Sequence, residues 1–117
     1  MERLRKNMKE YMTEITSKEA FEAAYHAEGV QVFTFSADWC PDCQFIKPFM
    51  PELIKAYPDY HFYYIDRDQC MDIAVEQMVM GIPSFIGVKN GNETGRFVSK
   101  LRKTKEEINT FLKDLDQ

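Results

Sequence analysis

The chain has 117 residues, 44% of them apolar and 14% aromatic, which suits one compact domain with a real core and leaves no room for a second. Its 19 acidic and 15 basic side chains give a net charge of -4, which argues against a nucleic-acid partner. No apolar run is long enough to span a membrane, and Glu10 and Glu14 interrupt the stretch where a secretory signal would be apolar. We therefore expect one cytoplasmic domain over residues 1–117, with residues 1–10 either ordered or a frayed extension.

The first half of the chain is predicted to alternate helix, strand and helix. A capping box over Thr16-Ser17-Lys18-Glu19 predicts the start of a short helix. The nearly continuous apolar run 30–35 predicts a buried, central strand. Apolar residues then recur at helical spacing over 45–54, and Pro48 and Pro51 should kink this helix or split it in two.

The second half is predicted to hold a strand, a short helix, a hairpin and a last helix. Asn90-Gly91 is a strong hairpin signal, and Thr104-Lys105-Glu106-Glu107 is a second capping box. With Tyr11–Ile15 as an extra edge strand, the order predicts an α/β fold, a central mixed sheet of four to five strands sandwiched by helices. The expected bounds are His61–Ile65 for the strand, Asp68–Met78 for the short helix with Met78 inward, and Ser84–Lys89 and Glu93–Ser99 for the hairpin.

Two of the three cysteines form the motif Cys40-Pro41-Asp42-Cys43, directly after the predicted central strand. This spacing on a helix places both sulfurs on one face within a turn, and Pro41 suits the first helical turn. The helix N-terminus favours the thiolate of Cys40, whereas Cys43 should be more buried. The pattern predicts thiol-disulfide exchange, in which Cys40 attacks a substrate disulfide and Cys43 releases the product, with no metal or organic cofactor.

Two other interpretations of the cysteine pair remain open, a half zinc site and two inert thiols. Zinc usually needs four ligands, and the remaining candidates, His26, His61 and Cys70, are scattered singly. The place of the motif at a junction of strand and helix favours redox chemistry over both alternatives. We interpret Cys70 as a small, partly buried thiol. The basic residues near the end of the chain are expected to be solvated surface: Lys100, Arg102, Lys103 and Lys105.

Taken together, three motifs resemble those of the thioredoxin family over roughly residues 21–115. They are Trp39-Cys40-Pro41-Asp42-Cys43, Gly81-Ile82-Pro83-Ser84-Phe85 and the Lys89-Asn90-Gly91 hairpin. The first motif also looks like that of a group of small eukaryotic thioredoxin-related proteins. The resemblance implies a thioredoxin fold and a protein-disulfide oxidoreductase that acts on disulfide-containing proteins or small molecules. It also implies that an NADPH-dependent thioredoxin reductase recycles the protein, which we expect to be a monomer.

The same resemblance assigns roles to individual residues. It implies that Cys40 is the nucleophile and Cys43 the resolving thiol, and that Trp39 shields the two sulfurs. It further implies that Pro83 follows a cis peptide bond and that the backbone of Ile82 pairs with an extended substrate segment. The substrate groove is then formed by Trp39, Gly81, Ile82 and Pro83. Pro48 matches the family's helix-kinking proline.

The chain departs from the family at two ionisable positions. The family has a buried aspartate six residues before the first cysteine, where this chain has Thr34, and the family's nearby lysine aligns with Phe62. Proton transfer must then use water, Asp42 or Thr34 as a relay. We hypothesise that Asp42 partly substitutes for the aspartate; alternatively, it only favours the first helical turn. The two losses also support an alternative function, a binding or redox-sensing module without general reductase turnover.

Two further stretches carry weaker signals. The run Phe62-Tyr63-Tyr64 is interpreted as strand core rather than as a platform for a ligand. The stretch around Cys70 resembles one in vertebrate cytosolic thioredoxins in which the cysteine is regulatory, but Gln77 and Gly81 stand where those proteins have further cysteines.

Overall fold

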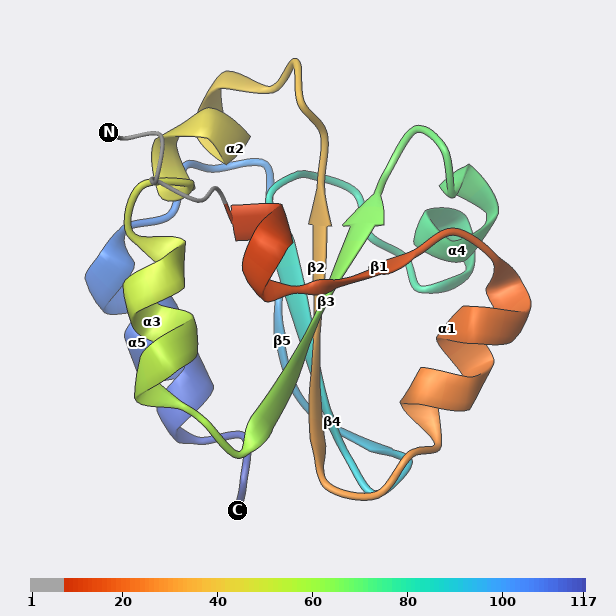
Figure 1. The fold of residues 1–117 in the computed structure, drawn as a ribbon. Helices are drawn as coiled ribbons and strands as arrows, with labels where there is room; N and C mark the ends of the chain where they lie inside the picture. Colours follow the sequence, from red (N-terminus) through yellow and green to blue (C-terminus); the bar gives the residue numbers. More distant parts are fainter. Residues whose placement is uncertain (1–7) are drawn as a thin grey trace.

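A five-stranded mixed sheet forms the centre of the molecule in the computed structural model, which describes residues 8–117 (Figure 1). The strand order is β1-β3-β2-β4-β5. β1, β3 and β2 run parallel to one another, β4 is antiparallel to β2, and β5 is antiparallel to β4. The predicted edge strand is therefore confirmed and completes the sheet. The bounds are β1 Thr13–Ile15, β2 Val30–Ser36, β3 Tyr60–Asp66, β4 Ser84–Lys89 and β5 Asn92–Phe97.

β2 is the central strand, as its apolar run predicts. All seven of its residues are buried, because β3 pairs with one edge and β4 with the other while helices cover both faces. Val32 lies beside Phe62 of β3 and beside Gly87 of β4. A strand buried on both faces has no need for alternating polar residues. The next segment of chain, which carries the two cysteines, therefore leaves from the middle of the sheet.

Helices cover both faces of the sheet. Figure 1 shows α1 and α4 on one side and α3 and α5 on the other. Since side chains alternate along a strand, Phe33 and Phe35 pack toward the first pair, whereas Val30 and Val32 pack toward the second. The helix bounds are α1 Lys18–Tyr25, α2 Pro41–Ile46, α3 Met50–Ala56, α4 Met71–Glu76 and α5 Lys105–Lys113, with a 3-10 helix at Met8–Tyr11.

Both predicted helix caps exist, one of them shifted by a residue. Thr104 caps α5 through a complete capping box: its Oγ1 accepts the Glu107 N–H at 3.1 Å, and the Glu107 carboxylate accepts the Thr104 N–H at 2.9 Å. In α1 the cap is Ser17, whose hydroxyl accepts the Ala20 N–H at 3.1 Å. The prediction of Thr16 as the cap was wrong, because two adjacent hydroxyl residues give the same local signal.

The prolines divide the helix after the cysteines into α2 and α3, as predicted. Pro48 lies in the break between the two helices, and Pro51 lies in the first turn of α3, where a missing N–H loses no helical hydrogen bond. α2 is therefore only six residues long.

The segment between β3 and β4 differs from its prediction. α4 spans only Met71–Glu76, because Asp66 Oδ1 accepts the N–H groups of Asp68 and Gln69 and forms a turn before the helix. The expectation of an inward Met78 was wrong: this residue has φ 58° and is 69% exposed. It follows the helix instead of belonging to its buried face.

The hairpin turn is confirmed. Asn90 and Gly91 both have positive φ, 51° and 83°, a combination that Asn-Gly pairs favour in two-residue hairpins. The second strand of the hairpin, β5, ends at Phe97, two residues before the expected Ser99.

Near the N-terminus, Met8 is fully buried at the start of the 3-10 helix, so residues 8–10 belong to the fold. The rest of the segment for which a frayed extension was considered, residues 1–7, lies outside the described residues. No helix within residues 8–117 is long and apolar enough to cross a membrane.

Candidate active site

Cys40 is the N-cap residue of α2, directly beyond the end of the central strand. Its backbone is extended, with φ -80° and ψ 119°, and Pro41 begins the helix. Cys40 Sγ accepts a hydrogen bond from the Cys43 N–H at 3.3 Å. The N–H groups of a first helical turn have no partner within the helix, and Cys40 Sγ satisfies one of them.

Cys43 lies one turn further into α2 and is fully buried. Burial, and to a smaller extent the hydrogen bond with Cys40, raise the pKa of the Cys43 thiol to about 12, although the Ser36 hydroxyl acts to lower it. Cys43 is therefore a protonated thiol near neutral pH. All three cysteines of the chain are free thiols in this structure.

The loop before β4 lies against the first sulfur. The Ile82-Pro83 peptide bond is cis, as the resemblance implies. The Cys40 thiol faces the Ile82 carbonyl oxygen, with Sγ 3.8 Å from it. The structure thus brings together two motifs separated by about forty residues of sequence and forms one wall of the predicted groove.

Gly81 stands where no side chain fits. A Cβ at this position would overlap the backbone of Ser99 and would lie 2.7 Å from the Lys100 Cα. The Ser84 hydroxyl also fixes the turn by donating to the Gly81 carbonyl at 2.6 Å. The loop that carries Gly81, Ile82 and Pro83, which we call the groove loop, therefore packs against the segment between β5 and α5. No sequence signal indicated this contact.

Trp39 is 63% exposed beside the first cysteine. Its indole Nε1 donates to Asp68 Oδ2 at 2.6 Å, and the Arg67 guanidinium lies 5.8 Å from its ring. These two hydrogen-bonding partners, Trp39 first and then Arg67, lower the pKa of Asp68. Asp68 thus fixes the orientation of the indole, and this role was missed because it joins residues 29 apart in sequence.

Asp42, inside the motif, forms an ion pair at the surface. Arg102 Nε donates to Asp42 Oδ1 at 2.8 Å, and the guanidinium lies 4.5 Å from the Phe45 ring. The hydrogen-bond partner of this carboxylate is therefore a cation, whereas a general base must contact the proton that it removes. The arrangement favours an electrostatic role at the helix start, and the hypothesis of Asp42 as a base stays a prediction.

Thr34 and Phe62 occupy the two positions where the family has ionisable groups, and both are buried. Phe62 packs in the apolar cluster toward α3 and α5. Thr34 Oγ1 is shielded from solvent and has no hydrogen-bond partner within residues 8–117. Phe62 and Tyr64 are core residues of β3, as predicted, and Tyr63 is half-buried.

Lys103 is buried, and the prediction that it is solvated was wrong. It is 1% exposed, and its ammonium donates to Ser99 O, Ser99 Oγ and Leu101 O at 3.0 to 3.2 Å. Burial lowers the pKa of Lys103, while Asp42, Cys43 and Cys40 among its neighbours act in the opposite direction. The lysine thus holds the segment that packs against Gly81.

Cys70 and one surface hollow lie apart from this site. Cys70 is 2% exposed, more buried than predicted, and its thiol donates to the Ile15 carbonyl at 3.6 Å.

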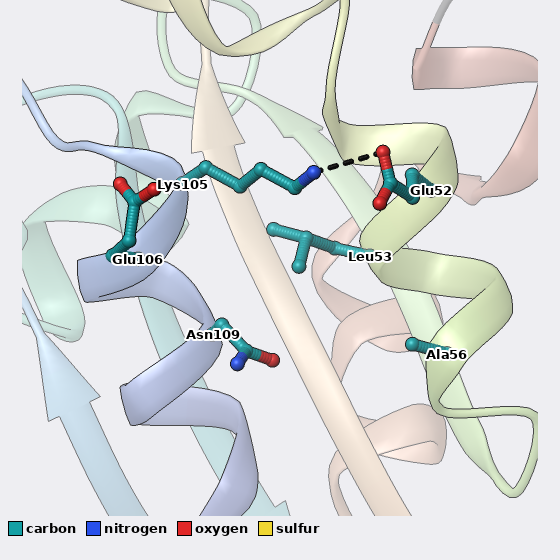
Figure 2. A pocket seen from close by; sticks show the side chains of 6 residues that line it. All are labelled: Glu52, Leu53, Ala56, Lys105, Glu106 and Asn109. Carbon is teal, nitrogen blue, oxygen red and sulfur yellow. Dashed lines mark ion pairs between the residues drawn. The ribbon is translucent and has the colours of Figure 1, made fainter.

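The hollow, of about 270 Å³, lies between α3 and α5, where Lys105 forms an ion pair with Glu52 at 2.8 Å (Figure 2). Within residues 8–117, no group of three or more His, Cys, Asp or Glu side chains is arranged to hold a metal ion.

Comparisons with known proteins agree with this geometry. The model of the thioredoxin family matches residues 12–114. Thioredoxin from Callithrix jacchus is 38% identical over 102 residues, which cover 85% of this chain and 97% of the relative. Thioredoxin from Homo sapiens is 41% identical over 86 residues, 72% of this chain and 82% of the relative. The crystal structure of oxidised mitochondrial thioredoxin 3 from Saccharomyces cerevisiae superposes with a TM-score of 0.81 at 30% identity, covering 92% of this chain and 99% of that one.

Proposed function

Because the chain belongs to the thioredoxin family, whose members are protein-disulfide oxidoreductases, we propose that it is a cytoplasmic reductant of protein or small-molecule disulfides. One observation carries the proposal. Cys40 Sγ, on a residue only 5% exposed, accepts an N–H at the start of α2 and faces the Ile82 carbonyl beside the cis-proline, while the fully buried Cys43 lies one turn further into α2. This asymmetry is what a two-step exchange between a nucleophilic and a resolving thiol requires.

In the first step, the Cys40 thiolate attacks one sulfur of a substrate disulfide held against the Ile82 backbone. A mixed disulfide forms between Cys40 and the substrate, and the other substrate sulfur leaves. In the second step, the Cys43 sulfur attacks Cys40 Sγ, which releases the substrate as a thiol and leaves a disulfide in the protein. Trp39, fixed by Asp68, flanks the reacting sulfur.

The oxidised pair must then be reduced by an external donor. By analogy with the family, we propose an NADPH-dependent thioredoxin reductase in this role. We propose the cytoplasm as its compartment because three cysteines are far fewer than a disulfide-stapled secreted scaffold has. We further propose that the protein acts as a monomer, which light scattering of the purified chain measures directly.

A second candidate function is a binding or redox-sensing module that forms the disulfide but turns over slowly. The observation in its favour is the pair of non-ionisable residues Thr34 and Phe62, both buried behind the cysteine site. Such a module would form the Cys40–Cys43 disulfide without sustained reduction of unrelated substrates.

Insulin reduction with dithiothreitol as donor separates the two functions. The first predicts rapid, repeated turnover that Cys40→Ser abolishes; the second predicts a rate no higher than that of dithiothreitol alone. Cys43→Ser should accumulate a mixed disulfide between Cys40 and the substrate, detectable by mass spectrometry, and Cys70→Ser is the matched control because Cys70 lies outside the site. If Cys43→Ser traps no substrate, the assigned order of attack is wrong.

The proposed donor has its own test. Oxidation of NADPH by a thioredoxin reductase should depend on the concentration of this protein when insulin is present. A reduction potential of the Cys40–Cys43 pair near about -270 mV would agree with a reductant, and one above about -200 mV would contradict that direction of electron flow.

A further inference from the structure

The stretch 99–103, between β5 and α5, contacts both parts of the candidate active site. A Cβ at Gly81 would lie 2.7 Å from the Lys100 Cα, so the stretch packs against the groove loop. On its other side, Arg102 Nε donates to Asp42 Oδ1 at 2.8 Å, inside the cysteine motif. The stretch therefore connects the groove loop with α2, the two elements that flank the reacting sulfur.

Arg102 lies within reach of a peptide bound at that sulfur. Cys40 Sγ is 3.3 Å from the Cys43 nitrogen, which a peptide bond links to Asp42. Standard bond lengths then place the Arg102 Nε within about 13 Å of the sulfur, through the Asp42 carboxylate that accepts from it. An extended peptide covers about 3.3–3.6 Å per residue, so a side chain within about four residues of the substrate cysteine can reach Arg102.

The Arg102 guanidinium has donors to spare for a further ligand. Its side chain is 52% exposed, and the Asp42 carboxylate accepts from Nε, so the N–H groups at the end of the side chain are available. Within residues 8–117, the structure shows no second hydrogen-bond partner for this group. The guanidinium lies over the Phe45 ring, 4.5 Å from its centre, and an arginine held on a ring keeps its N–H edges for a carboxylate.

The positive charge of the same stretch is only partly matched. Lys100 is exposed and forms no ion pair within residues 8–117, and the buried Lys103 ammonium donates to backbone and hydroxyl oxygens. The ion pair with Asp42 is thus shared among three cations, in a chain whose net charge is -4. Asp38 and Asp68, near the same motif, pair with other cations. An approaching carboxylate therefore meets an excess of positive charge at this stretch.

We propose that Arg102 selects protein substrates with acidic residues near the disulfide, by binding a carboxylate within about four residues of the substrate cysteine. Lys100 adds attraction at longer range. Leu101, which lies between the two cations in the sequence and is 74% exposed, offers apolar contact to the same peptide and so favours a peptide over a small anion. The proposal rests on the thiol-disulfide exchange proposed above and names the class of substrate that enters it.

The test compares three peptides of one sequence, each joined to a second copy through the disulfide of its single cysteine. They carry Glu, Gln or Lys at the third position on either side of that cysteine. Reduced protein is mixed with each peptide, acid stops the reaction, and chromatography measures the peptide thiol that is released. We expect the rate constant for the Glu peptide to exceed that for the Gln peptide by about threefold to fivefold at low salt, with the Lys peptide slowest. At about 1 M salt, the difference should largely disappear.

Arg102→Gln should bring the ratio of the Glu-peptide rate to the Gln-peptide rate down to about one, because the donor to the carboxylate is gone. Lys105→Gln is the matched control. It removes an equal charge at a nearby position, from a side chain that pairs with Glu52 at 2.8 Å in the hollow between α3 and α5. Its ratio should equal that of the parent protein.

Arg102→Gln also leaves the Asp42 carboxylate without its cation, and an unpaired carboxylate would itself repel an acidic peptide. The double variant of Asp42→Asn and Arg102→Gln separates the two causes. We expect its ratio to stay near one. A return to the ratio of the parent protein would show that repulsion by Asp42, and not a contact with Arg102, is responsible.

The proposal is also overturned by equal rates for the three peptides in the parent protein, by an unchanged ratio in Arg102→Gln, or by the same loss in Lys105→Gln. Circular dichroism verifies that each variant is folded. If Arg102→Gln does not fold, the salt series decides, since a ratio that does not change with salt contradicts binding by charge. If the parent protein reduces none of the peptides, the proposed exchange itself fails, whereas equal reduction of all three removes only the selection by Arg102.

Discussion

At the scale of single residues, the site combines a sulfur at a helix terminus with a second sulfur deep in the core. Cys40 accepts the Cys43 N–H, whereas Cys43 is surrounded by protein and its pKa is raised by burial to about 12. A thiol held protonated in this way resolves a mixed disulfide only if its thiolate is stabilised at that moment. The hydroxyls of Thr34, Ser36 and Tyr64 are also buried, and none has a hydrogen-bond partner within residues 8–117.

The unpartnered hydroxyl of Tyr64 predicts a stabilised variant. Tyr64→Phe removes a buried hydroxyl without a partner within residues 8–117, so we expect its free energy of unfolding to rise by about 1 kcal/mol. Tyr63→Phe removes a hydroxyl that is hydrogen-bonded to Gln31 and should lower the free energy of unfolding by about 1 kcal/mol. Urea unfolding of both variants measures the difference. A lower stability for Tyr64→Phe would show that its hydroxyl has a partner in solution.

The ion pair of Asp42 leads to a second prediction. Because the pair with Arg102 is at the surface, Asp42→Asn and Arg102→Ala should each change the free energy of unfolding by less than about 1 kcal/mol. We expect the resolving phase to keep its rate in Asp42→Asn, since the hydrogen-bond partner of this carboxylate is the guanidinium. A slower release of the second thiol, when the reduced variant is mixed rapidly with an aromatic disulfide, would instead support Asp42 as the base.

At the scale of elements, the sequence predicts well the features that local chemistry determines. The Thr104 capping box, the Asn90-Gly91 turn, the proline break and the buried central strand all depend on residues within a few positions of one another. Where two neighbours have the same chemistry, as Thr16 and Ser17 do, the local signal does not identify which one caps the helix.

The features of the site that the sequence did not predict are contacts between distant elements. Trp39 with Asp68, and Asp42 with Arg102, are contacts across 29 and 60 residues. Lys103 was expected in solvent because a basic cluster is usually exposed, but carbonyl oxygens and the Ser99 hydroxyl satisfy its ammonium inside the fold. Such contacts depend on how the elements pack, which the periodicity of one sequence does not specify.

The cap of α5 provides a prediction at this scale. Thr104→Ala removes the acceptor for the Glu107 N–H and should lower the free energy of unfolding by about 1 kcal/mol, without changing insulin reduction. Thr104→Ser, which keeps the hydroxyl, is the control and should remain close to the parent protein in urea unfolding. Equal losses in both variants would mean that the methyl group, not the cap, is responsible.

The groove loop provides a second prediction at the scale of elements. Gly81→Ala places a Cβ against the backbone of Ser99 and Lys100, so we expect a loss of about 1 to 3 kcal/mol in the free energy of unfolding. Insulin reduction should also fall, because Ile82 must move with its neighbour. Gly91→Ala, at the distant hairpin turn, is a control that strains the backbone through its φ of 83° but leaves the groove alone. Full insulin reduction by Gly81→Ala would show that the groove tolerates this shift.

At the scale of the whole molecule, stability should fall at alkaline pH. Burial raises the pKa of Cys43 from 9.0 and that of Tyr64 from 10.0, each to about 12, and it also raises the pKa of Cys70. A pKa raised by folding gives stability that is complete below the unfolded value and is lost as the pH rises through the folded value. Lys103, whose pKa is lowered by burial, acts in the opposite direction as a single group.

We therefore expect the free energy of unfolding of the reduced protein to decline between about pH 9 and pH 12. Cys43→Ala should decline less steeply, because one of the contributing thiols is gone. A series of urea unfolding curves across this range measures both slopes. A stability that stays constant or rises with pH would contradict the protonated, buried state of these groups.

The buried ammonium of Lys103 has a consequence for which positions of its own stretch can vary. It tethers the stretch 99–103, whose backbone abuts Gly81, while Leu101 and Arg102 on the same stretch are exposed. The loop that carries Gly81 is thus supported by a stretch that lies far along the chain from both cysteines. A substitution of the exposed Leu101 is therefore compatible with the fold, whereas one of Lys103 would release the stretch that supports the Gly81 loop.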